Sequence, residues 1–153
     1  MSLNKIRGFE AVSLIRRQTT DQFILPHRKT QQAAGYDIAT PLTVTIPAKQ
    51  SQLIWTNIKA YMQSHEVLLI YIRSSIGIQK GLILANGTGI IDADYYNNIS
   101  NEGNIGICLF NTTDQAVSLI AGERIAQGIF MPYLIADQGN EGDIRVGGIG
   151  SSD

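Results

Sequence analysis

The sequence predicts an all-β fold, and three observations support this class. Short apolar runs rich in β-branched residues recur along the chain, separated by clusters of Gly, Asn, Asp, Ser or Pro. That combination is typical of many short strands joined by turns. Few windows carry apolar residues at the i, i+3, i+4 and i+7 spacing of an amphipathic helix. At 153 residues with 44% hydrophobic content, the chain can build one core and is short for two domains.

The expected strands follow one another along the chain as five runs. They are LTVTIP at 42–47, EVLLIYI at 66–72, GLILAN at 81–86, NIGICLF at 104–110 and AQGIFMPYLI at 126–135. In each run, β-branched or large apolar residues gather beside a turn residue, which favours a strand. Between the second and third runs, SSIGIQKG at 74–81 is expected to hold at most a short helical turn.

The chain changes character near its end. Residues 1–136 are expected to form the β-domain, and residues 137–153, DQGNEGDIRVGGIGSSD, to form a mobile C-terminal arm. The arm is polar and rich in glycine, with too few large aliphatic residues to order itself. It carries Arg145 followed by glycines and serines, which are the materials of an anion-binding loop.

The charge balance narrows the classes of partner. Twelve Lys+Arg against thirteen Asp+Glu give a formal charge of −1, and neither sign forms a run. We therefore expect no nucleic-acid partner and no membrane partner. Without a signal peptide or a span of ~20 apolar residues, a cytoplasmic protein is expected. The single cysteine, Cys108, lies in an apolar run and is expected to be a small core residue.

The stretch GIIDADYY at 89–96 places two carboxylates directly after a strand-forming segment. Along an extended chain, Asp92 and Asp94 share one face, while Ile91, Ala93 and Tyr95 share the other. That alternation would put paired acids at the end of a strand. The alternative is that both aspartates are solvated residues of a hairpin turn.

Patterns for several common sites are missing: the sequence contains no GxxxxGK[ST], GxGxxG, HExxH or CxxC. Instead, five motifs appear in a characteristic order. They are AAGYDI at 33–38, RSS at 73–75, NGTGIIDADYY at 86–96, GERIAQ at 122–127 and RVGGIGSS at 145–152. This series resembles the five motifs of the trimeric dUTP diphosphatase (dUTPase) family, and the resemblance extends from KIRGFE at 5–10 onward.

The resemblance implies a dUTPase-like jelly-roll or β-barrel (β-clip) fold, assembled as a homotrimer with shared active sites. It implies that dUTP is hydrolysed with Mg²⁺ to dUMP and pyrophosphate, which limits uracil in DNA and supplies dUMP for thymidylate synthesis. Asp92 matches the carboxylate that deprotonates the attacking water, and Asp94 would support it. Tyr95 matches the tyrosine whose ring excludes a 2′-hydroxyl. Asn86 and the backbone around Gly89 and Ile91 match the groups that read uracil.

Other matching residues would hold the triphosphate. Arg73 and Ser74 match phosphate contacts of the RSS motif, with Ser75 beside them, and Gln127 matches a glutamine that reaches the phosphates. Planar guanidinium donors suit phosphate oxygens. Asp37 matches a carboxylate that holds the metal through water, which fits the hydration that Mg²⁺ retains. Arg124 is expected to pair with a carboxylate inside the barrel rather than with substrate.

The arm matches the family's closing segment, a lid that arrives from a neighbouring chain. The residues expected to contact substrate are Arg145, Gly148, Ile149, Gly150 and Ser151. Ile149 stands where the family usually has a phenylalanine stacked over uracil, so weaker substrate binding is expected. The terminal Asp153 departs from the family pattern as well. The stretch 96–104 is expected to be a surface hairpin extension.

Three functions are compatible with these residues. The first is dUTP hydrolysis, the second is deamination of dCTP by a related enzyme, and the third is nucleotide or protein binding by an idle relative. The deaminase alternative predicts an arm different from RVGGIGSS. The idle alternative rests on Ile149 and Asp153, but leaves the base, sugar and phosphate residues unexplained.

Overall fold

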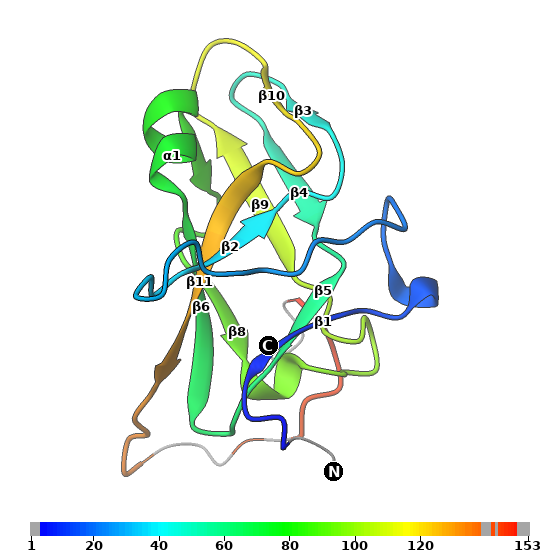
Figure 1. Cartoon of the computed structure of the whole chain (residues 1–153), viewed down its shortest axis with the longest axis vertical. Coiled ribbons are helices and arrows are strands. Elements are labelled where there is room, and N and C mark those ends of the chain that lie inside the picture. The colour runs from blue at the N-terminus through cyan, green and yellow to red at the C-terminus, as the bar shows by residue number, and fades with distance from the viewer. Residues whose placement is uncertain (1–3, 139–141, 143, 150–153) are drawn as a thin grey trace.

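The prediction of an all-β fold is confirmed by the computed structural model, which describes residues 4–138, 142 and 144–149. Within these residues the chain forms eleven strands, one α-helix and two 3₁₀ helices (Figure 1). The strands are β1 (Gly8–Ala11), β2 (Tyr36–Ala39), β3 (Val44–Ile46), β4 (Ser51–Trp55), β5 (Ile58–Tyr61), β6 (Glu66–Ile72), β7 (Leu82–Leu84), β8 (Gly89–Asp92), β9 (Gly106–Asn111), β10 (Val117–Leu119) and β11 (Arg124–Pro132). The helices are η1 (Leu14–Arg16), α1 (Ser74–Lys80) and η2 (Ala93–Tyr95).

The strands form small antiparallel sheets that pack on a shared core. The largest sheet has the order β2-β11-β6-β8, and the second has the order β4-β9-β7. Two ribbons, β1-β5 and β10-β3, complete the sheets of the described chain. Every strand pair in them is antiparallel.

The core consists mainly of isoleucine and leucine. The largest fully buried side chains are Ile38, Ile46, Ile54, Ile58, Leu68, Ile70, Leu82, Ile105, Ile107, Leu109, Leu119 and Ile125. They come from both larger sheets and both ribbons. β-branched residues pack well on pleated strands, so the isoleucines of the sequence serve both the strand backbone and the core.

The five expected runs all contain strands, but two local expectations are wrong. Residues 74–80 form a seven-residue α-helix, about two turns, rather than at most one short turn. Gly81 ends it in the left-handed conformation at φ 68°, which glycine adopts without strain. Residues 96–104 form successive turns rather than a hairpin, and Asn98 and Asn104 within them are buried.

Strand β6 sets the position of the candidate site residues. It pairs with β11 on one side and with β8 on the other, and Val67 lies opposite Asp92. β8 is the edge strand of its sheet, so one row of its backbone groups has no strand partner. In the described part of the chain, no helix is long and apolar enough to cross a membrane.

Candidate active site

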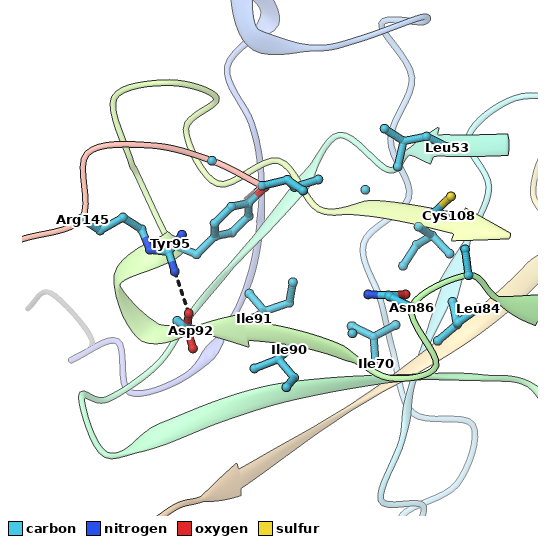
Figure 2. Close-up of a pocket in the computed structure, with 16 residues that line it drawn as sticks. Leu53, Ile70, Leu84, Asn86, Ile90, Ile91, Asp92, Tyr95, Cys108 and Arg145 are labelled. Carbon is cyan, nitrogen blue, oxygen red and sulfur yellow. Dashed lines mark hydrogen bonds and ion pairs between the residues drawn. The ribbon is translucent and has the colours of Figure 1, made fainter. Parts of the chain in front are cut away.

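A cavity of about 550 Å³ opens beside the edge strand β8. Its walls come from β8, the 85–86 segment that leaves β7, the start of β9, and the arm. Figure 2 shows polar side chains at both ends and aliphatic side chains along the floor: Asp92, Tyr95 and Arg145 lie at one end, and Asn86 lies at the other. The volume is in the range of pockets that enclose small ligands.

At the acidic end, one arginine of the arm binds both aspartates of the GIIDADYY stretch. Arg145 Nη2 donates to Asp92 Oδ2 at 2.6 Å, and Arg145 Nε donates to Asp94 Oδ1 at 2.8 Å. The Arg145 side chain is 13% exposed, whereas those of Asp92 and Asp94 are 53% and 61% exposed. The strand ends at Asp92 and Asp94 lies in η2, so the extended alternation stops, yet both carboxylates face one guanidinium.

Tyr95 forms a fixed wall of the cavity beside this pair. The residue is 5% exposed, and its hydroxyl donates to the Asn104 carbonyl at 2.6 Å while accepting from Asn101 Nδ2 at 2.8 Å. The Arg145 guanidinium lies 5.6 Å from the ring centre, within cation–π range. Burial raises the pKa of Tyr95, against smaller opposing effects of Asn101 and Arg145, so the hydroxyl is neutral near pH 7.

The opposite end is built from the turn between β7 and β8. Gly87 has φ 76° and its N–H bonds to the Leu84 carbonyl, which closes a tight turn and presents Asn86. At Gly89, a Cβ would lie 2.8 Å from Cβ of Ile70, so only glycine lets β8 approach β6 this closely. Gly89 and Ile91 both line the cavity, with the free edge of β8 available to a ligand.

A second polar cluster lies on β2, β11 and the residue preceding α1. Asp37 is 8% exposed and binds two arginines, Arg73 at 3.1 Å and Arg124 at 3.2 Å. The expectation that Arg124 pairs with a carboxylate in the barrel is thereby confirmed. Gln127 lies opposite Asp37 in the sheet, and its Oε1 occupies the space where a Cβ of Gly35 would stand.

Ser74 and Ser75 begin helix α1 directly after Arg73. Ser74 is exposed and Ser75 is half-buried. They lie next to the Asp37 cluster in sequence, not at the cavity. The two regions therefore divide the predicted site residues into a cavity group and a basic group.

The two groups lie at opposite ends of β6. Asp92 pairs with Val67 near its start, whereas Arg73 follows its last residue, Ile72. Six residues of extended chain span about 20 Å. Figure 1 shows the same separation, with α1 at one end of the sheet and the end of β8 toward the other. Within one chain, the backbones of Arg73 and Asp92 therefore lie about 20 Å apart.

Three of the five predicted arm residues line the cavity. Arg145, Gly148 and Ile149 do so, the last being 63% exposed; Gly150 and Ser151 lie outside the described residues. The arm residues contact the cavity of their own chain in this single-chain structure. Closure over a neighbouring site stays a prediction, as does the arm's mobility.

For a metal, the described residues offer Asp37 but no group of three or more His, Cys, Asp or Glu side chains. One oxygen of the Asp37 carboxylate accepts from Arg124, and the other forms an ion pair with Arg73. A carboxylate has about four acceptor positions, so water held by Mg²⁺ can still bond to it. The donor set fits an outer role for Asp37 and no direct coordination.

Some cavity residues were not expected from the sequence. Cys108 was expected in the core, but on β9 it faces away from the buried Ile107 and Leu109, is half-buried, and lines the cavity with Leu53. The strict alternation of NIGICLF could have indicated this. Asn101, which bonds to Tyr95, carries no comparable signal because it lies in an irregular loop.

The all-β fold and this cavity define a class of protein: all-β proteins whose cavity is large enough for a ligand of nucleoside size, with a carboxylate and an aromatic ring at one end and an amide at the other. A family model described as dUTPase matches residues 21–152. The chain belongs to the dUTPase family.

Individual relatives agree with this assignment. Deoxyuridine 5′-triphosphate nucleotidohydrolase of Lactococcus lactis is 46% identical over 150 residues, covering 97% of this chain and 98% of that protein. The crystal structure of dUTPase from Streptococcus mutans is 47% identical, covers 85% of this chain and 98% of its own, and superposes with a TM-score of 0.76. A mutant dUTPase of phage phi11 of S. aureus, described with a structural Mg(II) ion, shares the fold at 21% identity and a TM-score of 0.69.

Proposed function

We propose that the chain hydrolyses dUTP to dUMP and pyrophosphate, in a site that joins the cavity of one chain to the basic group of another. The observation that carries this proposal is the placement of Asp92 beside Tyr95 at the end of a cavity of about 550 Å³. Family membership supports the same activity. We place the reaction in the cytoplasm, where it would limit uracil incorporation into DNA and supply dUMP for thymidylate synthesis.

Asp92 is the general base of the proposed reaction. Its carboxylate accepts a proton from water, the water oxygen attacks the α-phosphorus, and the bond to the bridging oxygen breaks with pyrophosphate as leaving group. A base of this kind contributes ~10²–10⁴-fold. Arg145 donates to one oxygen of Asp92, and the other oxygen stays open to water. Substrate phosphates would draw the guanidinium away and free the second oxygen. Phosphate is a suitable competing partner for arginine.

The free edge of β8 would read the base. Uracil and cytosine exchange donor and acceptor at N3 and position 4, so backbone groups that satisfy one leave the other mispaired. A buried mispaired polar group costs roughly 1–3 kcal/mol. Asn86 adds an amide at the same end of the cavity. Thymine differs from uracil by a 5-methyl group, so its exclusion would have to be steric.

Tyr95 would select the deoxyribose. Its ring is 5% exposed and tied at the hydroxyl, so it cannot swing aside for a 2′-hydroxyl. A fixed apolar ring also leaves that hydroxyl without a partner. UTP would therefore bind poorly.

The triphosphate would contact Arg73, Ser74, Ser75 and Gln127 of a neighbouring chain in a homotrimer. The distance of about 20 Å between Asp92 and Arg73 within one chain supports a contribution from two chains. Mg²⁺, when bound, would neutralise phosphate charge. Asp37 would hold one of its waters while remaining paired to Arg73 and Arg124.

The arm would close the site with Arg145, Gly148, Ile149, Gly150 and Ser151 against base and phosphates. Closure expels water and fixes the phosphates for in-line displacement. Of these residues, Arg145, Gly148 and Ile149 already line the cavity, which supports the role of the segment as a lid.

The Asp92→Asn variant tests the proposed function. With Mg²⁺ and dUTP, the variant should release pyrophosphate ~10²–10⁴-fold more slowly than wild type, while binding dUTP with similar affinity. Asp94→Asn is the matched control, because it also removes one carboxylate from Arg145 but not the base, and should retain most turnover.

Parallel assays with dCTP and UTP separate the alternatives. Pyrophosphate released from dUTP alone supports the proposal. Ammonia released from dCTP would identify a deaminase, and binding of dUTP without either product would identify an idle relative. Full turnover by Asp92→Asn would remove Asp92 from the role of base.

A further inference from the structure

We propose that Asn101 is a positioning residue that holds the Tyr95 ring in place for sugar selection and supports the arm. This inference rests on the proposed hydrolysis of dUTP. Asn101 lies in the turns between η2 and β9, outside the five motifs. Its role is argued from its contacts alone.

Tyr95 depends on this loop for both hydrogen bonds of its hydroxyl. The loop supplies the donor, Asn101 Nδ2 at 2.8 Å, and the acceptor, the Asn104 carbonyl at 2.6 Å. A hydroxyl has one proton, and here that proton goes to Asn104. The amide of Asn101 therefore provides a bond that an acceptor-only side chain cannot replace.

The orientation of the Asn101 amide is determined by two other donors. Its Oδ1 accepts from Asn98 Nδ2 at 2.7 Å and from the Gly103 N–H at 3.0 Å. Both donors require oxygen at that position, so nitrogen must face Tyr95. The side chain is half-buried. A fully specified amide of this kind fixes the position of the hydroxyl, and with it the end of the ring that bears it.

The same amide contacts the arm. A Cβ at Gly148 would lie 2.8 Å from Asn101 Nδ2 and 3.1 Å from its Cγ, so the arm backbone approaches Asn101 as closely as glycine allows. Gly148 is buried and lines the cavity with Tyr95. Asn101 therefore touches both the wall and the lid of the site, and a shift of its side chain would move both.

The Asn101→Asp variant separates this role from loop folding. Aspartate keeps the oxygen that accepts from Asn98 and Gly103, but replaces the donor that faces Tyr95. The ratio of kcat/KM for dUTP to that for UTP should fall about three- to tenfold, mainly through a lower KM for UTP. Asn97→Asp is the matched control: it adds the same charge to the same loop and keeps the oxygen that accepts from Lys59, so its ratio should equal that of wild type.

Tyr95→Phe tests the same hydrogen bond by removing its acceptor, the Tyr95 hydroxyl. It keeps the ring but removes the hydroxyl, so it should lower the ratio by a similar factor, and adding Asn101→Asp should then lower it little further. A wild-type ratio in both Asn101→Asp and Tyr95→Phe would overturn the proposal. If Asn101→Asp lowered the ratio equally in wild type and in Tyr95→Phe, the proposal would also be overturned. If wild type does not hydrolyse dUTP, the proposed function itself fails.

Discussion

Arg145 shows at the level of single residues how the two aspartates at η2 are held together. A guanidinium offers several donors in one plane, and Asp92 and Asp94 each take one, at 2.6 and 2.8 Å. The arginine is thus held over the Tyr95 ring with 13% of its side chain exposed. Release of this contact by phosphate would free the Asp92 oxygen that Arg145 now holds.

Ile149 allows a test at a single position of the arm. It lines the cavity but is 63% exposed, so it covers a ligand without stacking on it. Ile149→Phe should lower KM for dUTP about tenfold, since a base–aromatic stack contributes roughly 1–3 kcal/mol. Steady-state kinetics checks this. Ile144→Phe, on the same arm but not in the wall of this cavity, should leave KM unchanged, and an unchanged or higher KM for Ile149→Phe would contradict the prediction.

Some site residues could be predicted from the sequence because their chemistry is local. Asp92 and Tyr95 fall in one motif and face one cavity, and Arg124 binds a carboxylate as expected. Asn101 could not be predicted, because its partners follow from a loop path that no periodicity specifies. The two acids had also been expected to share a strand face, but η2 brings them together instead.

At the scale of elements, strands in apolar stretches were predictable, including the three-residue β3 and β7. β6 and β9 match their runs closely, because their residues favour strands regardless of neighbours. β2 was not expected, since it is four residues long and contains aspartate, and its pairing with β11 determines it. Helix α1 was underestimated because the C-terminal stop at Gly81 and the contacts of buried Ile76 stabilise a second turn.

The loop at 96–104 is polar in sequence, yet it packs against the protein and bonds to buried side chains. Lys59 is 7% exposed and bonds to Glu102 at 2.7 Å and to Asn97 at 2.6 Å. Burial acts to raise the pKa of Glu102, but bonds from Lys59 and Ser13 outweigh it and lower the pKa. A sequence rich in Asn and Gly thus folds inward, because the buried side chains of Lys59 and Asn98 donate to oxygen atoms of the loop.

Strand β6 begins at a carboxylate that makes stability depend on pH. Glu66 accepts from Arg7 at 2.7 Å and from the Gln63 N–H at 3.0 Å. The Arg7 bond, opposed by burial, lowers the pKa of Glu66 below its usual 4.5. The stabilisation is therefore complete above pH 4.5 and is lost as pH falls through the lower folded-state pKa.

The Glu66→Gln variant should reveal this dependence. At pH 7 it should lower the free energy of unfolding by about 1 kcal/mol, since Arg7 is half exposed, and at pH 3 this deficit should be smaller. Urea unfolding at fixed protein concentration at the two pH values measures the difference. Asp114→Asn removes a carboxylate that is 93% exposed and should change neither value. A deficit for Glu66→Gln that persisted unchanged at pH 3 would contradict the assignment.

For the whole molecule, the decisive feature is the length of β6. The end of β8, which bears the proposed general base Asp92, lies beside the first residues of β6. Arg73 follows the last residue of β6. The backbones of the two residues are thus about 20 Å apart, which supports the proposal that each chain holds two half-sites. A closed ring of identical chains would satisfy all of them at once.

This division predicts complementation between two inactive variants. Asp92→Asn inactivates only the cavity half of a site, and Arg73→Ala inactivates only the basic half. When the two chains are unfolded together and refolded as a mixture, about a quarter of the sites should receive both intact halves. Pyrophosphate release should then rise from the background of either variant to about that fraction of wild type. A mixture of Arg73→Ala and Gln127→Ala, which spoil the same half, should not exceed the mean of its components. If mass analysis finds mixed oligomers of Asp92→Asn and Arg73→Ala without recovered activity, both residues serve one chain's site and the division is wrong.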